Sequence, residues 1–206
     1  MKHILFDLDG TLTDPKIGIT RSVQYALESF GIDVALDGLT KFIGPPLRAS
    51  FTNYFGFNAV QAEQAVVKYR EYFSERGIFE NRVYAGTPEL LKKLKGRGWK
   101  IILATSKAEI YAWKILEHFT FVCGDTLDGS RSEKAAIIRR ILNNVDGIKP
   151  GSAVMVGDRE HDIMGAKANG MASIGVLYGY GDKTELTKAG ALTPFALGLK
   201  VSRTRM

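Results

Sequence analysis

The amino-acid sequence predicts an α/β fold with a parallel sheet and a helical module inserted after the first strand. Short apolar runs, typical of buried strands, are separated by segments with helical spacing, and this alternation is typical of βα units. One interval near the N-terminus carries helical patterns of its own. It is far longer than the roughly 2–6 residues that usually join a strand to the next helix.

Five apolar runs are predicted as strands, and most are separated by a predicted helix. The strands are His3–Phe6, Lys100–Ala104, Phe121–Cys123, Ala153–Val156 and Ser173–Val176. The helices are Pro88–Arg97, Ala108–Phe119, Glu133–Asn143 and Asp162–Asn169. Thr87 before a proline is a good helix start, and Gly170 is typical of a helix end.

The long interval after the first strand is predicted to be helical. Apolar residues recur at helical spacing from Ile19 until Gly31, and a second helix is predicted over Ala62–Arg76, ending at Gly77. We therefore expect residues 1–14 and 85–206 to form an α/β core domain. Residues 15–84 are expected to form a helical domain, called here the insert.

Composition narrows the class of protein. The 206 residues carry a formal net charge of +6 and one cysteine, Cys123, which excludes an internal disulfide framework and a Cys-rich zinc site. The apolar run at the N-terminus is too short for a signal peptide, and no stretch approaches the roughly 20 apolar residues of a membrane span. Basic residues form no stripe with interleaved aromatics. We expect a cytoplasmic protein that binds neither membrane nor nucleic acid.

Two carboxylates follow the first predicted strand. Alternation places Asp7 and Asp9 on the same side of the extended chain, and Gly10 lets the backbone turn away. Two such charges at 4 Å repel by about 4 kcal/mol at an effective dielectric of 20, so a proton, a metal ion or a lysine must compensate. An acidic turn that merely ends the strand is the alternative.

A second acidic segment follows the strand predicted at Ala153–Val156. Asp158 comes at the strand end and Asp162 one helical turn later, so both can face one site. The alternative is that Asp158 caps the next helix and Asp162 is a solvated acid of its first turn. Together, Asp7, Asp9 and Asp158 suit a hard cation such as magnesium.

Two further segments offer groups that favour an anion. Ser106 and Glu109 match a capping box, which makes Ser106 a predicted N-cap and leaves Thr105 to offer its hydroxyl and amide. Lys107 can point into the site or into water, and water is the prediction. Lys134 opens a helix, where it opposes the helix dipole, and this suggests a role beyond that of a surface lysine.

These segments, taken together, resemble the haloacid dehalogenase-like hydrolase superfamily. The motifs that carry the resemblance are Asp7-x-Asp9-Gly10-Thr11, Thr105 after a strand, Lys134, and Gly157-Asp158-x-x-x-Asp162. Their order and spacing are similar to those of the family over nearly the whole chain. The resemblance implies a Rossmann-like core with a helical cap, and magnesium-dependent hydrolysis of phosphate monoesters, most like the phosphoglycolate phosphatase branch.

The resemblance also implies roles for single residues. Asp7 resembles the nucleophile that becomes an aspartyl-phosphate, and Asp9 the general acid and base. Thr105 resembles the phosphate-binding hydroxyl and Lys134 the charge-stabilising lysine. The implied magnesium ligands are Asp7, the Asp9 carbonyl and Asp158, with supporting Asp162. Substrate contacts are expected from Gly10, Thr11, Ser106 and Arg48.

Arg48 ends the sequence Phe42-Ile43-Gly44-Pro45-Pro46-Leu47-Arg48, which is a candidate specificity loop by resemblance. Arg48 can meet an anionic group of the substrate or simply face solvent. Tyr178-Gly179-Tyr180-Gly181 can line the mouth of the site or form a packed turn. The tail from Thr193 departs from the family pattern, and Ser202–Met206 is predicted to be mobile.

Several functions remain open at this level. The partner is expected to be a small phosphate ester, and the protein a monomer or homodimer. Besides a phosphoglycolate phosphatase-like enzyme, the sequence allows a 5'-nucleotidase or a phosphosugar mutase of the same superfamily. A catalytically silent, phosphate-binding regulatory protein is the non-enzyme alternative.

Overall fold

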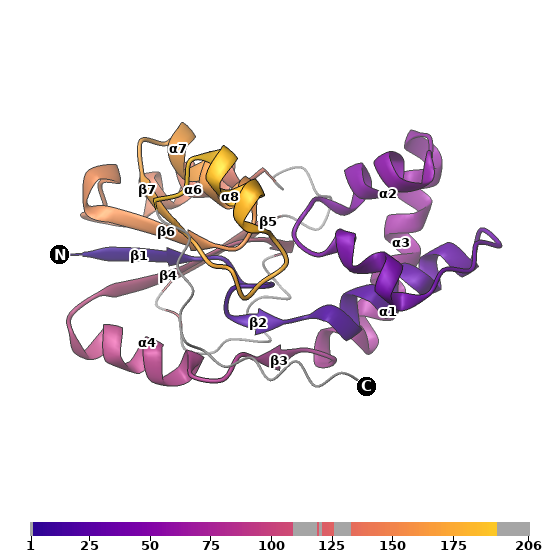
Figure 1. The fold of residues 1–206 in the computed structure, drawn as a ribbon, viewed down its shortest axis with the longest axis horizontal. Coiled ribbons are helices and arrows are strands. Elements are labelled where there is room, and N and C mark those ends of the chain that lie inside the picture. Colours follow the sequence, from indigo (N-terminus) through magenta and orange to yellow (C-terminus); the bar gives the residue numbers. More distant parts are fainter. Residues whose placement is uncertain (1, 109–118, 120, 126–132, 193–206) are drawn as a thin grey trace.

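A five-stranded parallel sheet forms the centre of the computed structural model, which describes residues 2–108, 119, 121–125 and 133–192. The strand order is β5-β4-β1-β6-β7 (Figure 1). The strands are β1 (His3–Phe6), β4 (Lys100–Ala108), β5 (Phe121–Asp125), β6 (Ala153–Gly157) and β7 (Ala172–Gly175). The predicted α/β class is confirmed, and the carboxyl end of β1 points toward the insert.

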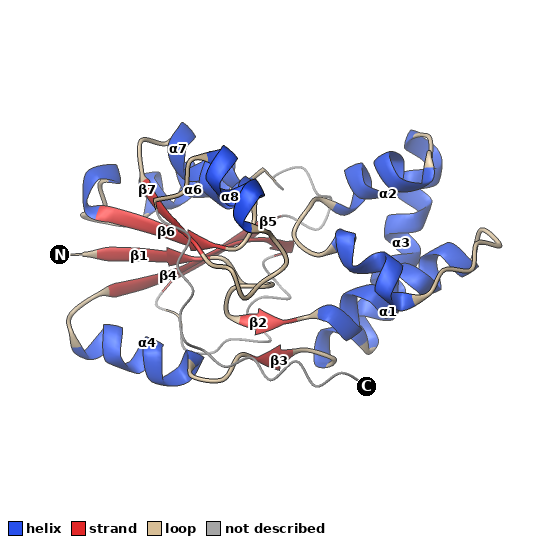
Figure 2. Cartoon of the chain, in the orientation of Figure 1, coloured by secondary structure: helices blue, strands red, loops and turns tan. Residues whose placement is uncertain are grey.

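Helices cover both faces of this sheet (Figure 2). The first, α4 (Thr87–Gly96), lies on one face, and α6 (Lys134–Asn144) and α7 (Glu160–Ala168) lie on the other, beside the short α8 (Lys183–Ala189). Alternation along β1 explains this arrangement: Ile4 and Phe6 pack in the cluster that includes Leu91, whereas Leu5 packs with Ile137. The sheet is therefore buried on both sides, as parallel sheets usually are.

Most predicted elements agree with the structure to within a few residues, and β4 is the main exception. It continues to Ala108 and pairs there with Asp125 of β5, four residues beyond the predicted end. The predicted helix start at Ala108 is therefore wrong, because strand pairing extends through the segment that the local capping signal assigned to a helix. The rest of that predicted helix, 109–118, lies outside the described residues, as do the tail predictions from Thr193 to Met206.

The insert consists of helices with a core of their own. It contains α1 (Lys16–Glu28), η1 (Leu36–Phe42), α2 (Leu47–Phe55), α3 (Ala59–Glu75) and η2 (Gly77–Phe79). Buried residues from these elements, including Leu27, Phe42 and Phe73, form one hydrophobic cluster. The α3 helix begins before its predicted start because Asn58 and Gln61 form a capping box. Within the part of the chain that is described, no helix combines the length and apolar character that crossing a membrane requires.

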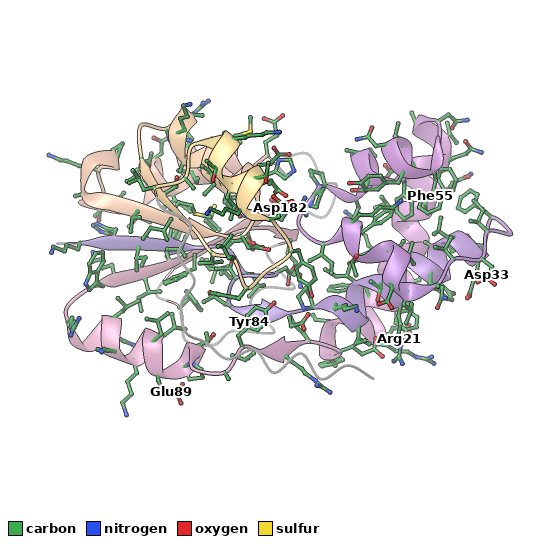
Figure 3. The ribbon with its side chains drawn as sticks, in the orientation of Figure 1. Arg21, Asp33, Phe55, Tyr84, Glu89 and Asp182 are labelled. Carbon is green, nitrogen blue, oxygen red and sulfur yellow. The ribbon has the colours of Figure 1, made fainter. Side chains whose placement is uncertain are left out.

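A two-stranded ribbon joins the insert to the sheet. It pairs β2 (Thr13–Asp14) antiparallel with β3 (Arg82–Val83), and the two chain crossings therefore lie side by side. Tyr84, labelled in Figure 3, follows β3 and its ring meets Tyr178 edge-on at 5.4 Å. The predicted domain boundaries, 14/15 and 84/85, fall at or next to this ribbon, and the division into two domains stays a prediction.

The contact between α1 and η2 depends on two glycines, which gives a test of the insert's packing. A Cβ atom at Gly18 would stand 2.1 Å from the Gly77 carbonyl oxygen. We expect Gly18→Ala to lower the free energy of unfolding by about 1–3 kcal/mol, because the two backbones must separate. Urea unfolding measures this. Gly96→Ala in α4, where nothing lies within 4 Å, is the matched control and should raise stability by about 0.5–1 kcal/mol. Equal losses in both variants would contradict the packing argument.

Candidate active site

The loop after β1 places two carboxylates at the carboxyl edge of the sheet. The Asp7 amide donates to the Val156 carbonyl of β6 at 2.9 Å, and the chain then turns tightly, with three successive amides directed at the Leu8 carbonyl. Gly10 adopts φ +91°, a conformation that favours glycine. Asp7 and Asp9 are both buried. The predicted position of the two acids at a strand end is therefore what the structure shows.

Asp158, at the end of β6, packs directly against this loop. A Cβ atom at Gly10 would stand 2.2 Å from Asp158 Oδ2, so only a glycine fits there without movement. The Thr11 hydroxyl donates to Asp158 Oδ1 at 3.1 Å, and the Tyr180 amide donates to Oδ2 at 2.8 Å. These contacts fix the carboxylate next to the loop after β1.

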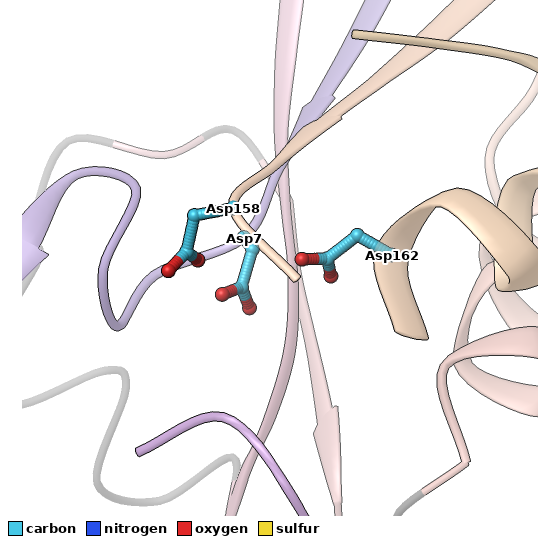
Figure 4. A group of neighbouring side chains, drawn as sticks. All are labelled: Asp7, Asp158 and Asp162. Atoms are coloured by element: carbon cyan, nitrogen blue, oxygen red, sulfur yellow. The ribbon is translucent and has the colours of Figure 1, made fainter. Parts of the chain in front are cut away.

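Asp7, Asp158 and Asp162 form one buried acidic cluster (Figure 4). One carboxylate oxygen from each lies within 4.8 Å of the others. Asp162, in the first turn of α7, approaches closely because Gly157 has no side chain; a Cβ atom there would stand 2.2 Å from the carboxylate. Its Oδ2 also accepts a hydrogen bond from the Arg159 amide at 3.2 Å. Strand ends and a helix start thus bring Asp7 together with Asp158 and Asp162, which lie far from it in the sequence.

Lys134 is the cation of this cluster. Its Nζ donates to Asp7 Oδ1 at 2.7 Å and to the Ala104 carbonyl at 2.9 Å, and it pairs with Asp162 Oδ1 at 2.8 Å. Burial lowers its pKa, but the charges of Asp162 and Asp7 outweigh burial and hold the pKa above its ordinary value. Lys134 is the first residue of α6, so the charge that the helix dipole disfavours is offset by two carboxylates.

The acidic cluster retains an excess of negative charge that suits a divalent cation. Burial, followed by the charges of Asp7 and Asp162, raises the pKa of Asp158 well above its ordinary value. Among the described residues, no cationic side chain forms an ion pair with Asp158. For Asp7, burial is the largest effect, and it raises the pKa to about 6 against the attraction of Lys134. One ammonium among three hard oxygen donors therefore fits a magnesium site.

Asp9 forms an ion pair with Lys107, a residue that the sequence predicts to face water. Lys107 Nζ donates to Asp9 Oδ1 at 2.9 Å, and both side chains are largely buried. The prediction that Lys107 faces water is wrong, because β4 continues through this residue. The sequence does contain a signal for this ion pair: Lys107 lies two residues after Thr105, at the strand end expected beside Asp9, an acid for which no cationic partner is predicted. Burial raises the pKa of Asp9, and the Lys107 charge opposes that rise.

The predicted anion-binding residues occupy different settings. Thr105 is buried, and its hydroxyl oxygen accepts from the Lys107 amide at 3.1 Å. Ser106 lies within β4, so the predicted N-cap role is wrong. Arg48 lies in α2, where its Nε donates to Glu63 of α3 at 2.7 Å, with both side chains half exposed. The predicted contacts of these residues with substrate stay predictions.

The Tyr178–Gly181 turn contacts the loop after β1, Asp158 and the insert. Tyr178 donates its hydroxyl to the Thr11 carbonyl at 2.8 Å, and Tyr180 donates its amide to Asp158 and its hydroxyl to Asp14. The Tyr180 ring packs against the hydrophobic cluster of the insert. Sequence reasoning left open whether this turn lines the site or packs. The observed contacts are those of a packed turn.

Comparison with known protein families identifies the class to which this fold and site belong. The sequence profile of the haloacid dehalogenase-like hydrolases matches residues 4–176. The chain belongs to this family, and it is an enzyme of the phosphatase class.

Several named relatives match most of this chain. A protein of Pseudomonas aeruginosa named 5'-nucleotidase is 49% identical over 191 residues, which are 89% of this chain and 86% of that protein. A protein of Mycobacterium tuberculosis named tyrosine-protein kinase PtkA is 39% identical; the match covers 89% of this chain and 66% of that longer protein. Phosphoglycolate phosphatase 1 of Pseudomonas aeruginosa is 30% identical, and the match covers 86% of this chain and 70% of that protein.

A solved structure shows the same architecture. The structure described as a predicted phosphatase from Clostridium acetobutylicum has a TM-score of 0.89 and 46% sequence identity. The match covers 92% of this chain and 91% of that one. The similarity therefore includes both the parallel sheet and the insert.

The burial of Asp7 predicts a pH-dependent stability. The pKa is about 6 in the folded protein and about 3.9 in an unfolded chain, so the ionised carboxylate destabilises the fold above pH 6. The contribution of Asp7 to the stability of the metal-free protein should rise as pH falls from about 6 to about 4. At pH 8 in EDTA, Asp7→Asn should raise the free energy of unfolding by about 2–3 kcal/mol, and this gain should vanish near pH 4.

Urea unfolding across this pH range measures the effect. Asp37→Asn is the matched control, since Asp37 is an exposed acid whose pKa is lowered by Lys16, the opposite direction. That variant should show no gain at pH 8. A lower stability of Asp7→Asn than of the parent at pH 8 would contradict the assigned direction.

Proposed function

We propose that the chain is a magnesium-dependent phosphomonoester hydrolase that acts on small phosphorylated metabolites through an aspartyl-phosphate on Asp7. The observation that carries the proposal is the buried acidic cluster in which Lys134 holds Asp7, at the carboxyl edge of the sheet. Ligands of open α/β sheets bind at this edge. The same proposal places the enzyme in the cytoplasm, as a monomer or homodimer with no nucleic-acid or membrane partner.

The residues support two successive displacements at phosphorus. Asp7 is proposed to attack the phosphorus atom while the bond to the ester oxygen breaks, and water then attacks the same phosphorus, releasing phosphate and Asp7. Lys134 fixes the Asp7 carboxylate through one oxygen and offsets charge on the phosphoryl oxygens. The Thr105 hydroxyl is proposed to bind a phosphoryl oxygen.

Asp9 is proposed to manage the protons of both steps. It gives a proton to the departing ester oxygen and then takes one from the attacking water. Lys107 holds its carboxylate, and burial favours the protonated form that the first step requires. Magnesium, held by Asp7, Asp158 and the Asp9 carbonyl with support from Asp162, would supply further charge neutralisation at the phosphoryl group.

Two substrate classes have specific support. The relative named 5'-nucleotidase has the higher identity, 49%. The relative named phosphoglycolate phosphatase 1 is 30% identical, and its name is that of the branch whose motifs this sequence most resembles. Both names describe hydrolysis of small phosphate monoesters. We therefore propose that class as the substrate, with 5'-nucleotides and phosphoglycolate as the first candidates.

A metabolite panel tests the proposed function. Pure protein should release phosphate from p-nitrophenyl phosphate and from at least one metabolite in magnesium, and EDTA should abolish this activity. Asp7→Asn should lower the rate by roughly a thousandfold or more, because the nucleophile is lost. Lys16→Met, a change in an exposed ion pair of the insert, is the control and should retain activity.

The opposite outcomes are equally specific. Magnesium-dependent hydrolysis that survives in Asp7→Asn would overturn the aspartyl-phosphate proposal. A requirement for a sugar bisphosphate, with transfer in place of hydrolysis, would indicate the mutase alternative. A pure protein that binds magnesium but turns over no ester in the panel would indicate the silent regulatory protein.

The role proposed for Asp9 predicts a dependence on the leaving group. An alkyl phosphate needs a proton on its departing oxygen, whereas p-nitrophenolate leaves readily without one. Asp9→Asn should therefore slow hydrolysis of an alkyl phosphate by about 10²–10⁴-fold and that of p-nitrophenyl phosphate by clearly less. Steady-state kcat values for both esters measure this difference. Equal losses for the two esters would contradict the acid role.

A further inference from the structure

Arg159 connects the end of β6 to the insert. It follows Asp158 directly, and its guanidinium contacts two separate parts of the molecule. Nε donates to Glu185 of α8 at 2.8 Å, and Nη1 donates to the Ile43 carbonyl of the insert at 2.7 Å. No residue role proposed above uses this side chain. It therefore forms a bridge between the sheet domain and the insert for which the chemistry gives no other reason.

The sheet side of this bridge is rigid. Glu185 Oε1 accepts from both Arg159 Nε and the Glu160 amide, each at 2.8 Å. Glu185 in turn donates its amide to the Asp182 side chain at 2.8 Å, in the N-cap of α8. Because a guanidinium is planar, fixing Nε also fixes the direction of Nη1. The bond to Ile43 is thus made by a group that is already held in place.

The insert side is closely packed. Ile43 is fully buried in the hydrophobic cluster of the insert. Gly44 adopts φ +102°, and a Cβ atom there would stand 2.9 Å from Arg159 Cγ. Pro45 and Pro46 follow and restrict the backbone before α2 begins. The segment at residues 43–46 is therefore a stiff edge of the insert that fits against the arginine stem.

The same residue also contacts the acidic cluster through its backbone. The Arg159 amide donates to Asp162 Oδ2, and its peptide bond joins it to Asp158. The side chains of Arg159 and Glu185 are each less than one-fifth exposed, so their ion pair is shielded from solvent more than an ordinary surface ion pair. The position of the 43–46 segment is thus tied to the turn between β6 and α7, which lies between two of the three carboxylates.

We propose that Arg159 is a positioning residue that latches the 43–46 segment of the insert beside the acidic cluster. Its effect on catalysis rests on the proposed function, but the latch itself does not. Without the latch, molecules in which the 43–46 segment lies beside the acidic cluster are a smaller share of the population, and the apparent affinity for substrate falls by that share. The expected signature is a change in KM larger than the change in kcat.

Distance measurements test the latch without any assay of activity. Cys123 is buried, so spin labels can be attached to cysteines introduced at Val60 of α3 and Lys167 of α7, which are both exposed. Double electron–electron resonance should give one narrow distance distribution in the parent and a broader or longer one in Arg159→Met. Arg97→Met is the matched control, because Arg97 is an exposed arginine of the sheet domain and its loss should change nothing.

Two more variants keep the result interpretable. Arg159→Lys should recover only part of the narrow distribution, because one ammonium cannot reproduce the fork that reaches both Glu185 and Ile43. Glu185→Gln removes the negative charge that holds Arg159, and it should broaden the distribution less than Arg159→Met does. If Arg159→Met does not fold, broadening in Glu185→Gln tests the latch in its place.

Kinetics with the best substrate of the panel provide the second readout. Arg159→Met should raise KM by about 5–150-fold, with a smaller change in kcat. An unchanged distance distribution would overturn the latch, and a loss confined to kcat would overturn its proposed effect on substrate affinity. If the parent hydrolyses no ester but Arg159→Met still broadens the distribution, the proposed function fails and the latch stands.

Discussion

The ammonium group of Lys134 is the constraint around which the site is organised. Three carboxylates cannot lie buried within 4.8 Å of one another without a compensating charge, and Lys134 contacts two of them directly. Three features position Lys134 for this contact. It lies at the start of α6, its ammonium group donates to the Ala104 carbonyl of β4, and Gly165 has no side chain to collide with it. Loss of the Lys134 ammonium would leave buried carboxylates without their cation, which commonly costs about 3–5 kcal/mol, so this lysine stabilises sheet and site together.

One lysine does not neutralise three acids, and this imbalance connects stability to function. Asp158 is held by a hydroxyl and an amide, which orient the carboxylate but do not cancel its charge. The fold tolerates the imbalance because both faces of the sheet are packed with apolar side chains from α4, α6 and α7. Destabilisation at an active site that is offset elsewhere is common in enzymes. Here it leaves a place for a cation and for an anion bound to that cation.

The sequence predicts the parts of this structure that depend on local pattern, and it misses those that depend on partners distant in the chain. Apolar runs and the residues that end them place Asp7 and Asp158 correctly, because each strand end lies at one edge of a parallel sheet. The capping signal at Ser106 is equally local, but pairing with β5 carries β4 past it and turns Lys107 toward Asp9. The pairing of Arg48 with Glu63 likewise depends on how α2 packs on α3, which the sequence does not display.

Two residues beside Asp158 connect the insert to the acidic cluster. Arg159 follows it in sequence and contacts Ile43; Tyr180 donates its amide to it and packs its ring on the insert. Any shift of the insert therefore acts on residues that flank a single carboxylate. Because this carboxylate is buried and lacks a cationic partner among the described residues, its orientation depends on hydrogen bonds, and Tyr180 donates one of them. The latch proposed at Arg159 therefore implies that a ligand that contacts both the insert and the acidic cluster shifts the position of the insert.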